Sequence, residues 1–539
     1  MRRVTLIVWL LSVLSAVLLS LPWLVPGTGI VALFAFLPLL VADVIARQNG
    51  MRRFWLCSLS CFIIWNSATT FWVCNATVGG GLFAILANSA QMLLIWLLFS
   101  LGKRKLGSGA LPYIFLAAMW IAWERRYFFV DISWPWLTLG NAFASTTKLA
   151  QWYEYTGTIG GSLWIWICNL SLFGMMMSLL SGSWGRWNIK ARASAVVASV
   201  AIFVVPVAAS LAIYGRYAEK SEGSVDVLIA QPNLDPYQKF ESLTQMEQTD
   251  ILLEQLQSAL AQEAGSDTML MIAPETFTSS VFLHDINANP SVQAMQQLLS
   301  RHPGSTMLFG ASTYDIYSQR TAPSLLARPY GNAWIESHNS AVVTDGQRHN
   351  EVYHKSKLVV GTELTPYPKI FVPLDNWLSS LMGVYGLMAR EVGQEERSLL
   401  HHGDVPFGCA VCYESIYGEY CTDYVKKGAK FMTVITNDAW WGNTPGYRQH
   451  CSYSRLRAIE LRRDIARCGN TGISCFIDQR GEFVSQTNWW QRETLRGSVN
   501  LNSEETFFVR NGDIAGRVCT LVFLLMVMLL VARLFKSER

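Results

Sequence analysis

Apolar segments long enough to cross a lipid bilayer are the feature of this sequence that most limits how it can fold. A helix needs about 20 apolar residues to span the hydrocarbon layer. Such segments lie near residues 4–25, 28–46, 54–75, 82–102, 111–130, 158–180, 194–215 and 517–535. The chain is 51% hydrophobic and only 15% charged, which is too apolar for an ordinary water-soluble chain of 539 residues. We therefore expect a polytopic α-helical membrane domain with eight spans.

The basic residues in the short loops predict how these spans are oriented, because Lys and Arg concentrate on the cytoplasmic side of membrane proteins. With eight spans, all of these clusters lie on one side: Arg2/Arg3, Arg47/Arg52/Arg53, Lys103/Arg104/Lys105, Arg186/Lys190/Arg192 and Arg533/Lys536/Arg539. The alternate loops 22–28 and 75–81 carry no charge. We therefore expect both termini in the cytoplasm and the segment between the seventh and eighth spans on the opposite side.

That long segment is more polar and contains short β-type runs. The expected strands are 225–231, 269–274, 306–312, 333–344, 406–413, 431–436 and 473–477, and two expected helices are 245–263 and 455–467. Strands that alternate with helices indicate an α/β layered fold, and roughly 300 residues suffice for a separate core. We therefore divide the chain into a membrane domain of seven helices (1–216), a soluble domain (217–516), and an eighth helix with a cytoplasmic tail (517–539).

Charge and cysteine content argue against two kinds of partner. The net charge is only +4 and the longest basic cluster is Lys103-Arg104-Lys105, so we expect no nucleic acid partner. The 11 cysteines are scattered and form no pair of CxxC motifs at the spacing of a zinc ribbon. The sequence therefore predicts neither a disulfide framework nor a metal site.

One apolar run in the soluble segment ends abruptly in a cysteine. Pro406-Phe-Gly-Cys-Ala-Val-Cys412 fits a short buried strand, and Tyr413 and Glu414 follow it directly. The end of a strand is a place where a rigid scaffold can present a nucleophile. The alternative is an inert core thiol, because free cysteine is among the most buried residue types.

Two other stretches place an ionisable group at the end of an apolar run. Met269-Leu-Met-Ile-Ala-Pro-Glu275 ends in a carboxylate, and partial desolvation would raise the pKa of that carboxyl and suit it to general-base work. Lys355 and Lys357 are spaced to point the same way from a strand, and a lysine beside a thiolate and an oxyanion would stabilise both. The alternatives are a helix cap or surface carboxylate, and solvated surface lysines.

The order Glu275, Lys355, Cys412 is similar to the Glu-Lys-Cys arrangement of the nitrilase superfamily, and the membrane segments around it resemble those of the apolipoprotein N-acyltransferase family. The matching motifs are Ile229-Ala-Gln-Pro-Asn233, Pro274-Glu275-Thr276, Tyr353-His-Lys355, Cys412-Tyr413-Glu414, Asn437-Asp-Ala-Trp440-Trp-Gly442, Arg457-Ala-Ile-Glu460-Leu and Asn470-Thr-Gly472-Ile. Each motif is weak alone, but their shared order and spacing over nearly the whole chain make the set specific. The resemblance implies an αββα sandwich for the soluble domain.

The resemblance also implies what these residues do. Cys412 would be the nucleophile, Glu275 the general base and Lys355 the group that stabilises the oxyanion. The implied reaction moves a fatty acyl chain from a membrane phospholipid, through a cysteine thioester, to the N-terminal amine of a diacylglyceryl-cysteine lipoprotein. It implies a monomeric enzyme of the bacterial inner membrane with a periplasmic catalytic domain and no cofactor.

Supporting residues follow from the same resemblance. Glu363 matches the second glutamate after the catalytic lysine, and Tyr413 and Glu414 match the pair beside the nucleophile. Two positions depart from the family pattern: Val359-Val-Gly-Thr-Glu363 replaces Val-Pro-Phe-Gly-Glu, and Phe240 stands where the family has a tryptophan. Phe240 keeps an aromatic ring, so we expect it at the active site.

Between Lys355 and Cys412 lies a segment that is unusually apolar for a loop, from Tyr367 to Met388. Trp377 and Leu378 stand near its middle. We hypothesise that it is a lid that dips into the membrane and admits acyl chains. The alternative is an ordinary core helix packed on the domain.

Other interpretations use the same residues. Cys409 and Cys412 form a CxxC, but residues three apart on a strand face opposite sides, and a redox CxxC normally starts a helix. A membrane-tethered nitrilase-like amidase would pass the acyl group of a small amide to water. A non-catalytic membrane scaffold or a transporter is disfavoured by the complete set of Glu275, Lys355 and Cys412, and a transporter also by the scarcity of ionisable residues in the spans.

Overall fold

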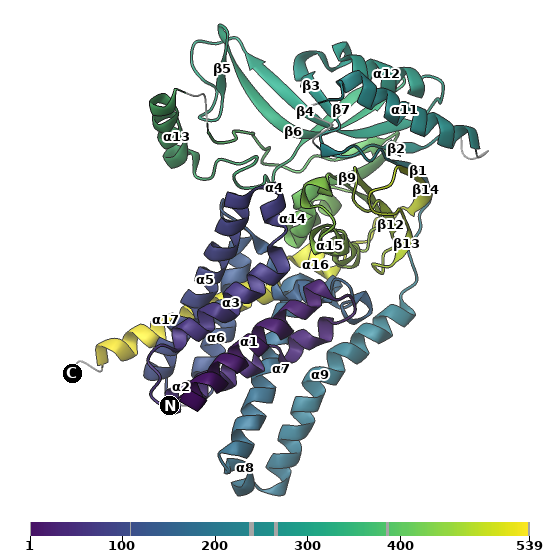
Figure 1. Cartoon of the computed structure of the whole chain (residues 1–539). Coiled ribbons are helices and arrows are strands. Elements are labelled where there is room, and N and C mark those ends of the chain that lie inside the picture. The colour runs from purple at the N-terminus through teal and green to yellow at the C-terminus, as the bar shows by residue number, and fades with distance from the viewer. Residues whose placement is uncertain (1, 108, 237–241, 263–267, 384–386, 537–539) are drawn as a thin grey trace.

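The computed structural model describes residues 2–107, 109–236, 242–262, 268–383 and 387–536. The chain forms a bundle of helices and an α/β part that lies against one end of the bundle (Figure 1). The N-terminus, at the start of helix α1, and the C-terminus, after helix α17, both lie toward the end of the bundle that is away from the α/β part. The two parts therefore have distinct positions, as the change in composition along the chain predicts.

Each of the eight apolar segments contains a helix in the described part of the chain. They are α1 (Arg2–Leu24), α2 (Leu37–Gln48) with the preceding 3-10 turn η1 (Gly29–Phe34), α3 (Phe54–Thr70), α5 (Val78–Lys105), α6 (Leu111–Tyr127), α7 (Tyr153–Leu180), α9 (Ile189–Arg216) and α17 (Ile514–Lys536). The short helix α4 (Val73–Ala76) lies between α3 and α5 in the chain, and the short helix α8 (Ser183–Arg186) lies between α7 and α9.

Six helical segments among the described residues are long and apolar enough to cross a membrane: 2–24, 29–48, 78–105, 153–180, 189–216 and 514–535. Helices α3 and α6 have 17 residues each. At 1.5 Å per residue this is about 26 Å, less than the roughly 30 Å of a hydrocarbon core. The predicted helical membrane part is therefore confirmed, but of its eight spans only these six are.

The α/β part contains two sheets. The strands of the first are β1 (Ser224–Gln231), β2 (Leu270–Ile272), β3 (Thr278–Phe282), β4 (Thr306–Tyr317), β5 (Arg328–Tyr330), β6 (Ala333–Asp345), β7 (Asn350–His354) and β14 (Glu493–Asn500). Their order is β14-β1-β2-β4-β6-β5, with β3 beside β4 and β7 beside β6. The central strands β1, β2 and β4 are parallel, and their parallel pairing places their carboxyl ends at one edge of the sheet.

The second sheet has the order β13-β12-β11-β10-β9-β8. Its strands are β8 (Leu400–His402), β9 (Val405–Val411), β10 (Met432–Thr436), β11 (Ile465–Gly469), β12 (Cys475–Ile477) and β13 (Phe483–Gln486). Strands β9, β10 and β11 are parallel, and every residue of β10 and β11 is buried. Such continuous burial is typical of parallel strands that are covered on both faces.

The two sheets pack face to face between two layers of helices. Cys468 of β11 lies with its Sγ 3.3 Å from the carbonyl oxygen of Ala230 in β1. Helices α11 (Gln245–Gln262) and α12 (Pro290–Leu299) cover the first sheet, and α14 (Gly418–Lys426) and α15 (Pro445–Leu461) lie between the second sheet and the bundle (Figure 1). The layer order agrees with the expected αββα sandwich.

The predicted helix 455–467 is wrong at its end. Helix α15 stops at Leu461, Arg462 takes a left-handed backbone conformation with φ of +49°, and residues 465–469 form β11. Arg467 hides this strand in the sequence, because a charged residue is rare in a central strand. Its side chain is fully buried, and it donates a 2.8 Å hydrogen bond to Asp438 Oδ2, so the buried charge is paired.

Helix α15 also holds the α/β part on the bundle. Trp136 Nε1 donates to Gln449 Oε1 at 2.7 Å, and Trp23 Nε1 donates to the Tyr453 hydroxyl at 2.9 Å. About two turns further along, Glu460 Oε1 accepts a 2.8 Å hydrogen bond from the backbone N–H of Thr158. Because these partners are buried and directional, they fix how the sheets are oriented relative to the bundle.

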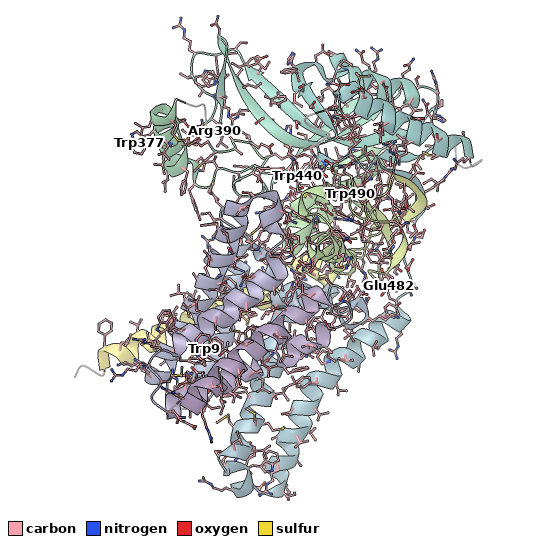
Figure 2. All side chains as sticks on the ribbon, in the orientation of Figure 1. Trp9, Trp377, Arg390, Trp440, Glu482 and Trp490 are labelled. Atoms are coloured by element: carbon pink, nitrogen blue, oxygen red, sulfur yellow. The ribbon has the colours of Figure 1, made fainter. Side chains whose placement is uncertain are left out.

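Helix α13 (Pro368–Met382) projects from the α/β part on the side of α4 and α5 (Figure 1). Arg390 anchors its inner face through a 2.7 Å ion pair with the buried Asp375. The outer face keeps Trp377 58% exposed and Leu381 66% exposed, and Figure 2 shows Trp377 at the outer edge of the helix. This helix is therefore not packed as a core helix on both faces.

Candidate active site

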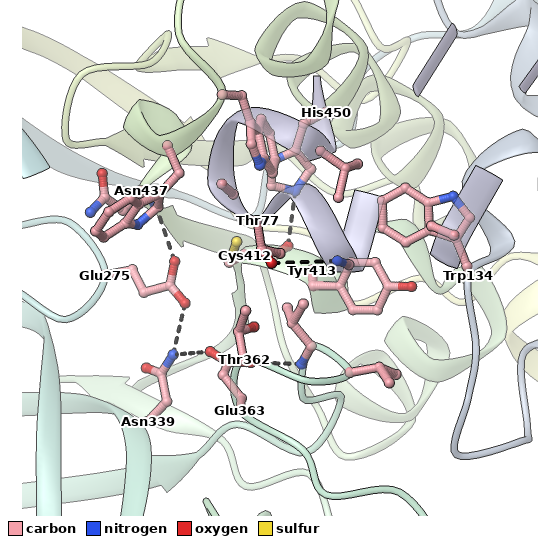
Figure 3. A pocket seen from close by; sticks show the side chains of 18 of the residues that line it. Thr77, Trp134, Glu275, Asn339, Thr362, Glu363, Cys412, Tyr413, Asn437 and His450 are labelled. Atoms are coloured by element: carbon pink, nitrogen blue, oxygen red, sulfur yellow. Dashed lines mark hydrogen bonds between the residues drawn. The ribbon is translucent and has the colours of Figure 1, made fainter. Parts of the chain in front are cut away.

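Cys412 lies directly after a buried strand, as the sequence predicts. Strand β9 ends at Val411, and Cys412 begins the 3-10 turn η6 (Cys412–Ile416). The φ angle of Cys412 is +52°, a left-handed conformation that is costly for a residue with a Cβ and that clusters at functional sites. The sharp turn presents the thiol at the wall of a cavity, where Figure 3 shows it beside Glu275.

Glu275 follows β2 and lies at the same cavity. Its carboxylate is 6% exposed and accepts three hydrogen bonds. Lys355 Nζ and Asn339 Nδ2 donate to Oε1 at 2.9 and 2.8 Å, and the backbone N–H of Asn437 donates to Oε2 at 3.1 Å. The carboxylate is therefore held in one orientation (Figure 3).

Lys355 is 1% exposed and lies between two carboxylates. Its Nζ donates to Glu275 Oε1 at 2.9 Å and to Glu363 Oε1 at 2.8 Å. The expectation that Lys355 and Lys357 point the same way from a strand is wrong, because β7 ends at His354. Lys357 instead lies at a second cavity, with its Nζ 3.4 Å from the carbonyl oxygen of Phe128.

The expected raised pKa of Glu275 is also wrong. Burial acts to raise the pKa of this carboxyl, but the Lys355 ammonium and the hydrogen bonds from Lys355 and Asn339 outweigh burial and hold the pKa below its ordinary value. Burial acts to lower the pKa of Lys355, but Glu275 and Glu363 raise it well above its ordinary value. At neutral pH the pair is thus a carboxylate and an ammonium.

Cys412 rests as a thiol. Burial and the Glu275 carboxylate raise the pKa of Cys412 well above its ordinary value, and the Lys355 ammonium offsets only part of this. The thiol and the Glu275 carboxylate line the same cavity. The arrangement can therefore transfer the thiol proton to Glu275 as the sulfur attacks an electrophile, and it places a cation beside the resulting charge.

Glu363 is held beside Lys355 even though the residues before it depart from the family pattern. Its Oε2 accepts a 2.7 Å hydrogen bond from the backbone N–H of Val359, inside the altered segment. Asn339 Nδ2 donates to Glu363 Oε1 at 2.9 Å as well as to Glu275. Sequence reasoning missed Asn339, which lies inside a long strand with no motif around it.

Glu414 ties the loop after Lys355 to the turn that carries Cys412. Its Oε1 accepts hydrogen bonds from Ser356 N at 2.7 Å and from Tyr353 Oη at 2.6 Å, and its Oε2 accepts one from Val411 N at 2.8 Å. Glu414 is fully buried, so these donors replace its hydration.

Tyr413 points the opposite way, toward the bundle. Its hydroxyl donates a 3.0 Å hydrogen bond to the carbonyl oxygen of Ser133, and its ring stacks on Trp134. Its neighbour Cys412 is therefore linked to both parts of the molecule. Phe240, the remaining residue expected at the site, lies outside the described residues.

Glu391 is a cavity residue that the sequence does not reveal. It lines the cavity beside Lys355 and Glu363, and its Oε2 is buried without a hydrogen-bond partner in the described structure. Burial, and then the neighbouring Glu363 carboxylate, raise the pKa of Glu391 to about 8. At neutral pH the site thus contains a third, neutral carboxyl group.

His450 is a second residue that sequence reasoning missed. Its Nδ1 lies 2.9 Å from Asp438 Oδ1, and its Nε2 lies 3.0 Å from the carbonyl oxygen of Cys412. Arg467 and Thr436 donate to the same Asp438 carboxylate. Cys412, Asp438 and His450 offer donor atoms within 4.8 Å of one another, but these bonds already occupy both nitrogens of His450 and both oxygens of Asp438, which does not fit a metal ligand set.

The cavity in front of Cys412 has a volume of about 510 Å³, and both parts of the molecule line it. Trp72 and Thr77 come from the helical bundle, and Trp134 comes from the loop after α6 (Figure 3). Trp440 and Trp441 close the side of the α/β part. Aromatic and aliphatic walls around one polar cluster suit a substrate with a reactive carbonyl and apolar chains.

Comparison with known proteins gives matches over nearly the whole chain. Residues 237–507 match the model of the carbon-nitrogen hydrolase family, and residues 15–171 match that of the apolipoprotein N-acyltransferase N-terminal domain. An apolipoprotein N-acyltransferase of Chlorobaculum tepidum is 27% identical over 94% of this chain and 94% of its own length. One of Geobacter metallireducens is 26% identical over 95% of this chain and 93% of its own length.

Some solved structures are also similar to this chain. A nitrilase-superfamily protein of Saccharomyces cerevisiae is 14% identical and covers 53% of this chain and 93% of its own, with a TM-score of 0.36. The first family model spans half of the 539 residues. The chain therefore belongs to the carbon-nitrogen hydrolase family, and it combines that domain with the N-terminal domain of the apolipoprotein N-acyltransferases.

Proposed function

We propose that this protein is an N-acyltransferase that moves a fatty acyl chain from a membrane phospholipid to the N-terminal amine of a diacylglyceryl-cysteine lipoprotein. The observation that carries the proposal is the buried cluster of Glu275, Lys355 and Cys412 at a cavity whose other wall is the helical bundle. The full-length similarity to apolipoprotein N-acyltransferases supports the same reaction. The donor and acceptor are both lipids, which suits a site at the junction with membrane helices.

In the first half-reaction, Cys412 attacks the ester carbonyl of the phospholipid. Glu275 takes the thiol proton as the bond between sulfur and carbon forms, and Lys355 stabilises the negative charge on the carbonyl oxygen. The bond between the carbonyl carbon and the glycerol oxygen then breaks, and Glu275 returns its proton to that oxygen. A lysophospholipid leaves, and the acyl chain remains on Cys412 as a thioester.

In the second half-reaction, the α-amine of the lipoprotein attacks the thioester. Glu275 takes the proton that the amine loses, and Lys355 again stabilises the oxyanion. The bond between carbon and sulfur breaks, and Glu275 returns the proton to the Cys412 sulfur. The product is an N-acyl amide, and the enzyme returns to its starting state.

The residues around the triad would act by positioning it. Glu363 and Asn339 hold the Lys355 ammonium and the Glu275 carboxylate in place. Glu414 holds the turn of Cys412. Phe240, in the segment that follows Gln231-Pro-Asn233, stays a prediction for the substrate pocket.

The alternative enzyme, a membrane-tethered amidase, would need water to reach the thioester and hydrolyse it. The tryptophans that wall the cavity favour an apolar substrate over a small polar amide. A non-catalytic scaffold would not need a buried thiol, carboxylate and ammonium at the wall of one cavity. Both alternatives are therefore less well supported than acyl transfer.

The membrane arrangement is part of the proposal. We place residues 1–216 and 517–539 in the bacterial inner membrane with eight spans, and residues 217–516 in the periplasm, with both termini cytoplasmic. The charge pattern of the loops supports this arrangement. The short helices α3 and α6 would span the membrane because the bilayer thins locally around them or because their flanking turns add to their length. We propose that the protein acts as a monomer.

The position of the loop after α5 distinguishes eight spans from six. With eight spans the loop is cytoplasmic, and if α3 and α6 do not cross it is periplasmic. We expect a membrane-impermeant thiol reagent to label Val484→Cys, which is exposed on β13, in cells with a permeable outer membrane. Arg104→Cys should react only after the inner membrane is opened, and labelling of Arg104→Cys in intact cells would exclude eight spans.

Intact-protein mass spectrometry tests the covalent step directly. After incubation with phospholipid alone, the wild-type protein should gain the mass of one fatty acyl chain, and hydroxylamine should remove it because it cleaves thioesters. Cys412→Ser should gain no hydroxylamine-sensitive mass, and Cys409→Ser, three residues away, should behave as wild type. A folded wild-type protein without an adduct would contradict the mechanism.

The pKa of Glu391 predicts a decline in activity at high pH. Below about pH 8 this carboxyl is neutral, and as the pH rises through about 8 it adds a negative charge beside the oxyanion. The rate of acyl transfer should therefore fall by roughly tenfold above this pH, which corresponds to the interaction free energy of one pKa unit. Glu391→Gln stays neutral and should lose this decline, while Glu395→Gln, an exposed neighbour, should keep it.

Helix α13 is proposed as a lid that dips into the membrane surface. Its exposed residues Ile370, Trp377 and Leu381 form an apolar face outside the sandwich, and Leu378 is half-buried beside them. Such a face is stable only against lipid or another apolar surface. The lid would place acyl chains at the mouth of the catalytic cavity.

Charged substitutions test the lid. Trp377→Glu with Leu378→Glu should lower acyl transfer from phospholipid in vesicles by about tenfold or more, because a carboxylate resists burial in lipid. Transfer from a short-chain, water-soluble ester should stay near the wild-type rate. Val484→Glu serves as the control for an exposed apolar residue elsewhere. Unchanged transfer from vesicles would exclude the lid.

A further inference from the structure

A second cavity lies at the junction between the helical bundle and the α/β part. Its volume is about 290 Å³, and none of the residues that line it lines the catalytic cavity. Arg125, Phe128 and Phe129 contribute from the end of α6, and Lys357 and Arg397 contribute from the loops before β8. The proposed reaction makes no use of this cavity.

Lys357 enters this cavity without a carboxylate partner. Its Nζ contacts only the Phe128 carbonyl oxygen, at 3.4 Å, and the face of the Tyr417 ring, at 5.2 Å from the centroid. Among the described residues, no carboxylate oxygen lies within 4.0 Å of this Nζ. This half-buried ammonium therefore has no close ion pair among the described residues.

Arg397 is the second cation of this cavity. Its guanidinium lies 4.0 Å from the centroid of the Tyr420 ring, and its Nη1 donates a 3.0 Å hydrogen bond to the Glu395 carbonyl oxygen. Its Nε makes no hydrogen bond and faces Asp423 Oδ2. Asp423, at 3.6 Å, is the nearest carboxylate and also pairs with Lys426 at 3.7 Å. Arg397 therefore keeps donor capacity that the protein does not use.

The two cations repel each other across the cavity. Burial, and after it the Arg397 charge, lower the pKa of Lys357, and the Glu414 and Asp131 carboxylates offset only part of this. Two like charges held close in a partly buried space are relieved by an anion between them. The geometry therefore favours a ligand with negative oxygens, such as a phosphate, at Lys357 and Arg397.

The other carboxylates that line the cavity, Glu419, Glu460 and Asp513, have partners of their own. Glu419 Oε1 accepts a 3.3 Å hydrogen bond from the backbone N–H of Asp513. Asp513 accepts a 2.7 Å hydrogen bond from Gly516 N and lies 3.6 Å from Arg125. Glu460 is bound to Arg457 at 2.8 Å and to Thr158. These carboxylates belong to the contacts that join the two parts, and they leave the side with Lys357 and Arg397 positively charged.

The position of the cavity indicates where such an anion would come from. Arg125, Phe128 and Phe129 mark the end of α6, a proposed span, and aromatic and basic side chains at a helix end lie at the depth of lipid headgroups. Basic pockets beside transmembrane helices can bind headgroup phosphates. A free phosphate ion would share the same chemistry but would gain nothing from Phe128 and Phe129.

We propose that this second cavity binds the headgroup phosphate of a membrane glycerophospholipid between Lys357 and Arg397, at a site separate from the catalytic cavity. The phosphate oxygens accept hydrogen bonds from both cations, and the phenylalanines contact the glycerol and the start of the acyl chains. This inference rests on the proposed membrane arrangement and does not require acyl transfer.

Native mass spectrometry of the full-length Cys412→Ser protein tests the site, because no thioester can form and failure of the proposed function leaves the result unaffected. The delipidated protein is titrated with dioleoylphosphatidylglycerol, and with dioleoylglycerol as a lipid without phosphate. We expect one retained adduct that needs the phosphate, and we expect Lys357→Gln with Arg397→Gln to weaken it by about tenfold or more. Lys430→Gln with Arg301→Gln makes the same charge change elsewhere and should leave it unchanged.

Two further measurements separate the outcomes. Lys357→Arg with Arg397→Lys keeps both charges, so it should retain the adduct, and its loss would mean that the glutamine variants act through misfolding and would overturn the proposal. Equal retention of dioleoylglycerol, or an adduct that all variants keep, would also overturn it. If inorganic phosphate displaces the lipid and stabilises the protein against heat as well as the lipid does, the site binds free phosphate and the assignment to lipid is wrong.

Discussion

The buried contact of Lys355 with Glu275 and Glu363 is the interaction on which the rest of the site depends. A lysine that is 1% exposed would lose its charge without partners, and the buried Glu275 carboxylate depends on the lysine in turn. Together they keep a cation and an anion at one end of a dry sandwich. The fold makes this possible because β2, β7 and β9 all end there, so that Glu275, Lys355 and Cys412 meet from two sheets.

This charged centre is held by a chain of contacts that reaches the membrane helices. Glu414 joins the loop after Lys355 to the turn of Cys412, and Tyr413 joins that turn to Ser133 of the bundle. A change in the packing of the bundle would therefore be felt at the nucleophile. This coupling explains why the catalytic part is built onto the membrane helices through many buried hydrogen bonds rather than tethered to them by one span.

The sequence allowed most of the fold to be predicted, because apolar runs bounded by turns mark both the membrane helices and the strands that end in Glu275 and Cys412. It failed where a polar residue occupies the core. Arg467 hid strand β11, since its burial depends on Asp438, which lies 29 residues earlier. Glu391 and His450 have no local signal either, because their environments are made by distant segments. The direction of the pKa shift of Glu275 was wrong for the same reason: the decisive charge, on Lys355, is 80 residues away.

A resting thiol with a raised pKa suits this site better than a thiolate would. A permanently ionised sulfur beside two carboxylates would be repelled by them, and it would react with oxidants and small electrophiles between turnovers. Here the sulfur becomes nucleophilic only as Glu275 removes its proton, when a carbonyl is already placed beside Lys355. In the proposed reaction, the tryptophans that line the cavity would keep water from the thioester, so that the intermediate could last while one lipid leaves and another arrives. In the proposed reaction, the Cys412 sulfur is thus reactive only when a substrate fills the cavity. An enzyme that exchanges two membrane-bound substrates at one cysteine requires this.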